Sequence, residues 1–212
     1  MNEQNNLNNV EELNSIENNK PEKKSSFLKD LIKDIIIAVV IVLAITAVIK
    51  PTIVKEDSML DTLQSNNYLF VNKMAYKFKD HPERGDIIVF RSELINEEDG
   101  SKKLLIKRVI GVEGDVISFE DDYVYRNGKL LDENYIYDEE PSFRNYPNGK
   151  EFVVGEDEIF AMGDHRSVSW DSRSEDVGMV PEDNVVGKAF IRLFPFNEIG
   201  LLERDSLERF YR

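Results

Sequence analysis

The chain has 212 residues and a formal net charge of −14, from 41 Asp and Glu against 27 Lys and Arg. A field of that sign repels phosphate backbones, so we expect no nucleic acid partner. The sequence contains no Cys and two His, which excludes thiol nucleophiles, disulfides and multi-histidine metal sites, whereas an all-oxygen Ca²⁺ or Mg²⁺ site stays open.

The N-terminal segment is rich in Asn. Its first 19 residues contain eight Asn and almost no bulky apolar side chains. Such a segment buries too little surface to offset the entropy lost on ordering. We therefore predict a disordered tail over residues 1–30.

An uninterrupted apolar run, "IIIAVVIVLAITAVI", follows at residues 35–49. Leu31 and Ile32 extend it toward the length of about 20 residues that a membrane span needs. The run has no polar face, which argues against the alternative of a buried core helix. A second alternative, a cleaved secretory signal, is disfavoured by the seven acids that precede the run and by Ile45 at the small-residue position of the best cleavage site. We predict an uncleaved transmembrane helix over residues 31–51.

Lysines set the predicted orientation of this helix. Five of them precede the span and two follow it closely. Because cytoplasmic flanks carry the excess of Lys and Arg, the N-terminus is predicted to be cytoplasmic and residues 52–212 to lie outside the plasma membrane.

Residues 52–212 are predicted to form a mainly β domain. Short runs rich in β-branched and aromatic residues are separated by Gly, Asn and Asp, as is typical of strands. Asn127-Gly128 is a strong hairpin signal, and Asn148-Gly149 is a second one. Residues 91–103 and 132–150 are interpreted as loops or insertions. The predicted strands are "YLFVNK", "GDIIVF", "KLLIKRVIGV", "DVISF", "DYVYRNGKLL", "KEFVV", "EIFAM" and "VVGKAFIRLF".

The stretch "DSMLDTL" at residues 57–63 raises the question whether Ser58 is a nucleophile or a helix cap. A serine before helix formers is most often an N-cap. As a nucleophile it needs a base that takes its proton. His81 lies in a polar turn and is interpreted as a surface residue. His165 lies in a segment dense in polar groups, so a Ser58–His165–Asp triad is one reading, although no G-x-S-x-G elbow supports it.

A buried lysine is the other possible base for Ser58. Lys107 stands between Leu105 and Ile106 on one side and Val109 and Ile110 on the other. A lysine acts as a base only when neutral, and burial lowers its pKa. The alternative is a lysine at a strand edge whose ammonium reaches solvent.

Four segments, "SMLDTL", "RGDIIVF", "IKRVIGVEGD" and "MGDHRSVSWDSR", resemble the successive blocks of the bacterial type I signal peptidases, in the same order and behind an N-terminal anchor. The closing "VVGKAFIRLFPF" is also similar. The resemblance covers roughly residues 35–196. It implies a signal-peptidase-like β-domain that removes signal peptides from preproteins at the phospholipid surface, with no cofactor and no metal.

The resemblance also implies roles for individual residues. Ser58 would be the nucleophile and Lys107 the general base, and Ser169 would hydrogen-bond the lysine. Asp171 and Arg173 would form an ion pair that shapes their loop. Arg108 and Asp164 would play supporting parts, and the Ser58 N–H would stabilise the oxyanion.

The implied substrate is an extended peptide that adds beside the strand predicted at residues 53–57 and beside the strand that leads to Lys107. Shallow apolar pockets would select small side chains such as Ala, giving cleavage after Ala-x-Ala. The implied pocket residues are Val54, Met59, Leu63, Leu69, Val89, Leu105 and Ile106.

Three positions depart from the family pattern. Asp61 stands where the family often has Pro, and His165 stands where it has Asn. Glu56 stands where many members carry a hydroxyl that assists the oxyanion hole, a role that an ionised carboxylate cannot fill. These departures leave two alternatives to an active signal peptidase: a catalytically silent relative that binds preproteins or a membrane partner, and a processing peptidase with one dedicated substrate.

Overall fold

The computed structural model describes residues 22–78, 80–97, 99–137, 146–147, 149–202 and 204. The chain divides into two compact units, Met1–Ala47 and Val48–Arg212. Most of the predicted tail, Asn148 of the second hairpin signal and nearly all of the last dozen residues lie outside the described residues.

The first unit contains a single described helix, α2, at Glu22–Val48. It begins before the predicted start at residue 31, so the prediction that residues 22–30 belong to a disordered tail was wrong. The segment contains Glu, Lys and Leu, which are strong helix formers, and no Gly or Pro interrupts it. The helix also ends earlier than residue 51, because Ile49–Ile53 form strand β1.

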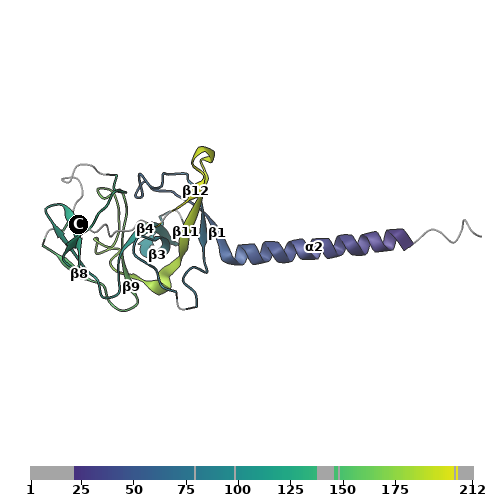
Figure 1. The fold of residues 1–212 in the computed structure, drawn as a ribbon, viewed down its shortest axis with the longest axis horizontal. Coiled ribbons are helices and arrows are strands. Elements are labelled where there is room, and N and C mark those ends of the chain that lie inside the picture. The colour runs from purple at the N-terminus through teal and green to yellow at the C-terminus, as the bar shows by residue number, and fades with distance from the viewer. Residues whose placement is uncertain are drawn as a thin grey trace, which may run out of the picture. The chain divides into compact units, whose positions relative to one another are not determined.

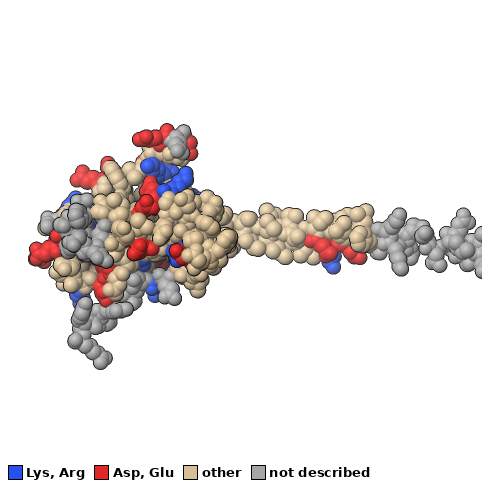
Figure 2. All heavy atoms as spheres, turned by 90° about the horizontal axis from the view of Figure 1, so that it is seen from above, with Lys and Arg blue, Asp and Glu red and all other residues tan. Residues whose placement is uncertain are grey.

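The apolar part of α2, Phe27–Val48, has 22 residues and none of it is buried. At 1.5 Å per residue it is roughly 33 Å long, which is enough to cross the hydrocarbon core of a bilayer. Figure 2 shows charged side chains on the described helix only toward its N-terminal part. Its length and composition therefore suit the predicted membrane span.

The second unit is built from two antiparallel sheets, which confirms the mainly β prediction. The larger sheet has the strand order β1-β2-β11-β3-β4-β9-β10, with β12 paired to β11. Figure 1 shows β11, β3, β4 and β9 side by side. Its strands are β1 (Ile49–Ile53), β2 (Tyr68–Asn72), β3 (Ile87–Ile95), β4 (Lys102–Val112), β9 (Glu158–Met162), β10 (Val180–Pro181), β11 (Val185–Phe194) and β12 (Gly200–Leu201).

The smaller sheet has the order β7-β6-β5-β8. Its strands are β5 (Val116–Glu120), β6 (Tyr123–Arg126), β7 (Lys129–Leu130) and β8 (Glu151–Val153). Asn127 and Gly128 join β6 to β7 with φ of 54° and 74°. Two positive φ angles are the signature of the type I′ hairpin, as the sequence predicted. Two short 3₁₀ helices, η2 (Glu182–Asn184) and η3 (Phe196–Glu198), flank β11.

Two local predictions on the larger sheet were wrong. Of the predicted strand at residues 53–57, only Ile53 belongs to a strand, as the last residue of β1. Residues 54 and 55 have no regular secondary structure, residues 56 and 57 form a bend, and the apolar run before them supplies the strand instead. Residues 91–103 are a hairpin rather than a loop, because β3 continues to Ile95 and β4 begins at Lys102. Its turn uses Gly100, whose φ of 70° suits glycine.

The larger sheet is buried on both faces around β3 and β4. Four consecutive β3 residues, Ile87–Phe90, are buried. Because successive side chains point to opposite faces, Ile87 and Val89 enter one apolar cluster, whereas Ile88 and Phe90 enter another. Lys107 of β4 pairs with Ile88 and thus lies in the centre of this sheet.

Candidate active site

Ser58 lies in a turn that follows β1, with 7% of its surface exposed. The turn is closed by hydrogen bonds from the Leu60 N–H to the Asp57 carbonyl (3.3 Å) and from the Leu63 N–H to the Met59 carbonyl (2.7 Å). No described helix begins at this turn, so the reading of Ser58 as an N-cap was wrong.

Lys107 brings its amine to the Ser58 hydroxyl. The distance between Lys107 Nζ and Ser58 Oγ is 2.6 Å, and Nζ also donates to the Ile106 carbonyl at 3.0 Å. The lysine is 1% exposed. Burial lowers its pKa, against the opposing effects of Asp171 and Glu56. The arrangement thus provides a hydroxyl next to an amine whose neutral form is favoured, which is what nucleophilic catalysis by serine needs.

The segment after β9 packs directly on the Ser58 turn. The His165 N–H donates to the Ser58 carbonyl at 3.1 Å. A Cβ added to Gly163 would approach the Ser58 carbonyl oxygen and Ser169 Oγ to less than 3.0 Å, so only glycine allows this approach. The contact fixes the backbone of the turn that carries Ser58.

Ser169 does not form the expected hydrogen bond to Lys107 in this structure. Its Oγ is buried and makes no hydrogen bond of standard geometry to the described residues, but it lies close enough to the Asp171 carboxyl to help lower the pKa of that group. It lies against Gly163, which also contacts the Ser58 carbonyl. Ser169 is therefore brought to the site without the predicted contact.

Asp171 and Arg173 form the expected ion pair. Arg173 donates from Nε to Asp171 Oδ1 at 2.8 Å and from Nη2 to Oδ2 at 2.9 Å. Burial alone would raise the pKa of the Asp171 carboxyl, but Arg173 and the Gly163 N–H hold that pKa below its usual value. The carboxylate therefore stays ionised and fixes the loop, since Gly163 N–H donates to it at 3.0 Å.

Arg108 and Asp164 form a second buried pair, 2% and 0% exposed. Arg108 donates through Nε at 2.9 Å and through Nη2 at 2.7 Å. Thr62, which the sequence interpretation missed, joins the pair by donating to Asp164 at 2.5 Å and accepting from Arg108 at 3.1 Å. This network links β4, the Ser58 turn and the segment after β9.

Six of the seven implied pocket residues are brought together. Five belong to one buried apolar cluster, and Ile106 packs against it. Leu105 belongs to the other cluster, with Val109. Leu105 and Ile106 are consecutive in β4, so their side chains leave on opposite faces and cannot line the same side of one pocket. The five clustered residues are Val54, Met59, Leu63, Leu69 and Val89.

The three departures from the family pattern lie around the Ser58 turn. Glu56 and Asp61 are both exposed. The His165 ring packs 4.6 Å from the Tyr137 ring, and its Nδ1 lies 3.1 Å from the Asp57 carbonyl. The Ser58 hydroxyl is hydrogen-bonded to Lys107 at 2.6 Å. The geometry thus favours the lysine over the histidine as the base.

Sequence reasoning also missed Arg166, which is 1% exposed and lies four residues before the "WDSR" segment. Most of its neighbours in "GDHRSVS" are polar. The signal that could have found it is the density of polar residues in a segment flanked by the buried strand β9.

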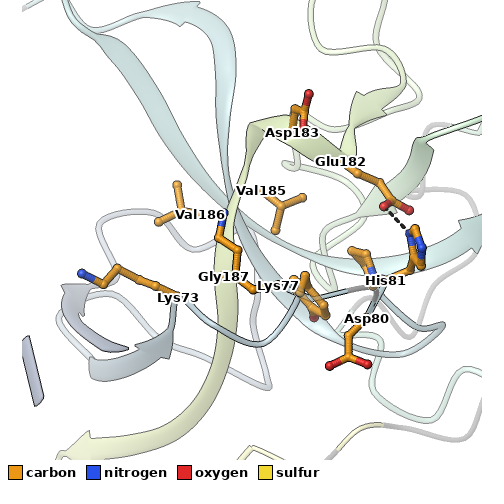
Figure 3. A pocket seen from close by; sticks show the side chains of 11 residues that line it. Lys73, Lys77, Asp80, His81, Glu182, Asp183, Val185, Val186 and Gly187 are labelled. Carbon is orange, nitrogen blue, oxygen red and sulfur yellow. Dashed lines mark hydrogen bonds and ion pairs between the residues drawn. The ribbon is translucent and has the colours of Figure 1, made fainter. Parts of the chain in front are cut away.

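Outside this site, a cavity of about 190 Å³ lies beside η2, and Figure 3 shows its lining. The nearby side chains of His81, Asp157 and Glu182 place one ligand atom each within 4.8 Å of one another, so they could hold a metal ion. His81 Nδ1 already lies 2.7 Å from the Glu182 carboxylate. The cavity lining contains none of the residues implied for catalysis or substrate binding.

Comparison with known proteins identifies the family. The family described as "Signal peptidase, peptidase S26" matches residues 28–194. A probable signal peptidase I-2 of Synechocystis is 37% identical over 161 residues, covering 76% of this chain and 70% of that protein. A signal peptidase I of Bacillus caldolyticus is 36% identical over 160 residues, covering 70% of this chain and 81% of that protein.

A crystal structure of a signal peptidase I from Enterococcus faecalis is 30% identical, with a TM-score of 0.38, and covers 50% of this chain and 95% of that chain. The family match spans both the apolar helix and the sheets that hold Ser58 and Lys107. The chain belongs to the signal peptidase family, peptidase S26.

Proposed function

We propose that this chain is an active, membrane-anchored signal peptidase I, which cleaves preproteins after small residues with Ser58 as nucleophile and Lys107 as general base. The observation that carries the proposal is the 2.6 Å separation of Lys107 Nζ and Ser58 Oγ at a site where both residues are buried. Family membership supplies the substrate class.

The proposed reaction begins with a neutral Lys107. Its amine takes the Ser58 proton as Oγ attacks the carbonyl carbon of the scissile peptide bond, which forms a tetrahedral intermediate. The Ser58 N–H stabilises the oxyanion of this intermediate. The lysine ammonium then protonates the leaving amine, and the same lysine activates the water that releases the acyl group from Ser58.

The proposed peptide-binding surface lies between the Ser58 turn and β4. The side chains of Val54 and Ile106 meet there, together with the buried cluster around Met59. A close-packed apolar surface leaves room for small side chains and excludes larger ones. The chain segment before the cut would therefore bind as an extended peptide with Ala next to Ser58.

The helix α2 supports the proposed location. Its apolar span is long enough to cross a bilayer. The excess of lysines before it supports an orientation with the N-terminus in the cytoplasm and the β unit on the outer side of the plasma membrane, where signal peptides emerge beside the phospholipid.

The test is cleavage of a preprotein with an Ala-x-Ala site by the purified full chain in detergent with phospholipid. Ser58→Ala and Lys107→Ala serve as inactive controls, and Lys129→Ala, an exposed lysine of β7, serves as the matched control. We expect cleavage after the second Ala by the wild type and by Lys129→Ala only. A folded wild type that binds the preprotein without cutting it would refute the proposal and favour a silent binding protein.

A further inference from the structure

The described part of the 132–150 segment is anchored to the loop behind Ser58 by a buried ion pair. Arg166 is 1% exposed, and the Glu133 side chain is 7% exposed. Arg166 donates to Glu133 from Nη2 at 2.6 Å and from Nη1 at 3.2 Å. Two parallel hydrogen bonds fix both the distance and the orientation of the guanidinium group.

Arg166 connects this ion pair to Ser58 through Gly163. Its Nε donates to the Gly163 carbonyl at 3.0 Å. The α-carbon of Gly163 faces the Ser58 carbonyl oxygen so closely that no Cβ fits between them. Arg166 itself is held from the other side, since Arg173 Nη2 donates to the Arg166 carbonyl at 2.7 Å.

Two tyrosines from the same segment complete the contact. The Tyr146 hydroxyl lies 2.6 Å from Arg166 Nη1, where it accepts a hydrogen bond. The Tyr135 ring lies 4.0 Å from Arg108 Cζ and 5.8 Å from Arg166 Cζ, within the range of cation–π attraction. Tyr135 is therefore next to both buried arginines that face the site.

Glu133 supplies the negative charge that balances the buried guanidinium of Arg166. A buried guanidinium without a counter-ion is strongly unfavourable. Burial would lower the pKa of Arg166, but Glu133 first, and then Tyr146 and Tyr135, raise that pKa well above its usual value. Without Glu133 the arginine would have to turn toward water and release the Gly163 carbonyl.

We propose that Glu133 is a positioning residue for Ser58, which acts by holding Arg166 on the Gly163 carbonyl and so keeps the loop after β9 against the nucleophile. This gives the described part of the 132–150 segment a role in positioning Ser58, and the inference rests on the proposed function. Glu133 touches neither the nucleophile nor the base, so its effect is expected on turnover and not on substrate binding.

The experiment compares three forms of the full chain in detergent with phospholipid: Glu133→Gln, the double variant Glu133→Leu with Arg166→Met, and the matched control Glu151→Gln on exposed β8. For Glu133→Gln we expect kcat to fall by about tenfold or more with KM changed by less than about twofold. Glu151→Gln should keep both constants. The double variant removes both charges, so its Tm should recover relative to Glu133→Gln while its kcat stays low.

A double variant that regains kcat together with Tm would show that the pair serves stability alone, and an unchanged kcat in Glu133→Gln would also overturn the proposal. Hydrogen exchange at the His165 amide, which donates to the Ser58 carbonyl, gives a readout without turnover. We expect faster exchange there in Glu133→Gln, and unchanged exchange would count against the proposal. A wild type without peptidase activity would refute the proposed function, and the exchange measurement would still decide the role of Glu133.

Discussion

Replacing Gly163 with Ala tests the contact between the loop after β9 and Ser58, the proposed nucleophile. The added Cβ would lie closer than 3.0 Å to the Ser58 carbonyl oxygen and to Ser169 Oγ, a separation that Cβ atoms essentially never show. The serine hydroxyl could rotate away. The carbonyl oxygen is backbone and is held by the His165 N–H, so the Ser58 turn itself has to shift.

The size of the effect follows from that shift. Added atoms in a close-packed site typically cost about 1–3 kcal/mol of stability. A displacement of about 1 Å at a catalytic group costs on the order of 10²-fold in rate. We therefore expect Gly163→Ala to lose roughly 10²-fold in kcat/KM on an Ala-x-Ala preprotein, while it remains folded with a Tm lowered by several degrees, about 2–4 °C per kcal/mol for a domain of this size.

The matched control is Gly200→Ala in β12. Its φ is compatible with any residue, and the nearest atom to an added Cβ is the Glu198 carbonyl oxygen at 4.0 Å. This variant should keep its Tm and its kcat/KM. Wild-type kcat/KM in Gly163→Ala would refute the inference that the Ser58 backbone is held in place by this loop.

Three further predictions concern charge. Lys107→Met should abolish turnover without lowering Tm, because it replaces a buried amine by an apolar side chain of similar length. The stability of the wild type should rise with pH between the depressed pKa of Lys107 and its ordinary value of 10.5, because in that range only the unfolded chain binds the lysine proton. Urea titrations of the Lys107→Met variant should lack this rise. Asp171→Asn removes a charge that raises the pKa of Lys107, so the acidic limb of the pH–rate profile should move to lower pH. The unpaired Arg173 should lower the free energy of unfolding by about 3–5 kcal/mol. An acidic limb that stays in place or moves to higher pH would contradict the assignment of Lys107 as base. Glu182 raises the pKa of His81 by accepting its hydrogen bond, so NMR titration should give a His81 pKa above 6.5 that falls in Glu182→Gln. The stabilisation of the fold by this pair should be present at low pH and should vanish as pH rises through the folded-state pKa of His81.

The strands could be predicted because their burial pattern is local. The four buried residues of β3 form a continuous apolar run, and the Asn127-Gly128 turn needs the positive φ angles that these residues tolerate. Helix and strand could not be separated where one apolar run continues through both. Residues 49–51 read as the end of the membrane span, yet they pair with β2, a contact that depends on residues 70–72.

The candidate site was predictable where the chemistry itself restricts the residue type. A lysine among aliphatic residues on a strand is either a buried amine or a strand-edge residue whose ammonium reaches solvent. The family resemblance favoured the first, and the structure has Lys107 at 1% exposure. Thr62 and Arg166 were missed because their partners are distant in sequence, Asp164 for the first and Glu133 for the second. The predicted Ser169 contact depends on side-chain torsion angles, which no pattern of residue types specifies.

Charge pairing explains why Lys107, among the buried cations at this site, is suited to act as a base. Arg108 pairs with Asp164 and Arg166 pairs with Glu133, so each guanidinium keeps its charge inside the protein. Lys107 Nζ instead contacts neutral oxygen atoms, of Ser58 and of the Ile106 carbonyl, and no carboxylate lies within ion-pair distance of it in the part of the chain that the structure describes. Without a carboxylate to stabilise the ammonium, burial favours the neutral amine. The same buried surroundings in which carboxylate partners keep the arginines charged therefore lower the pKa of Lys107, as the general base of the proposed function requires.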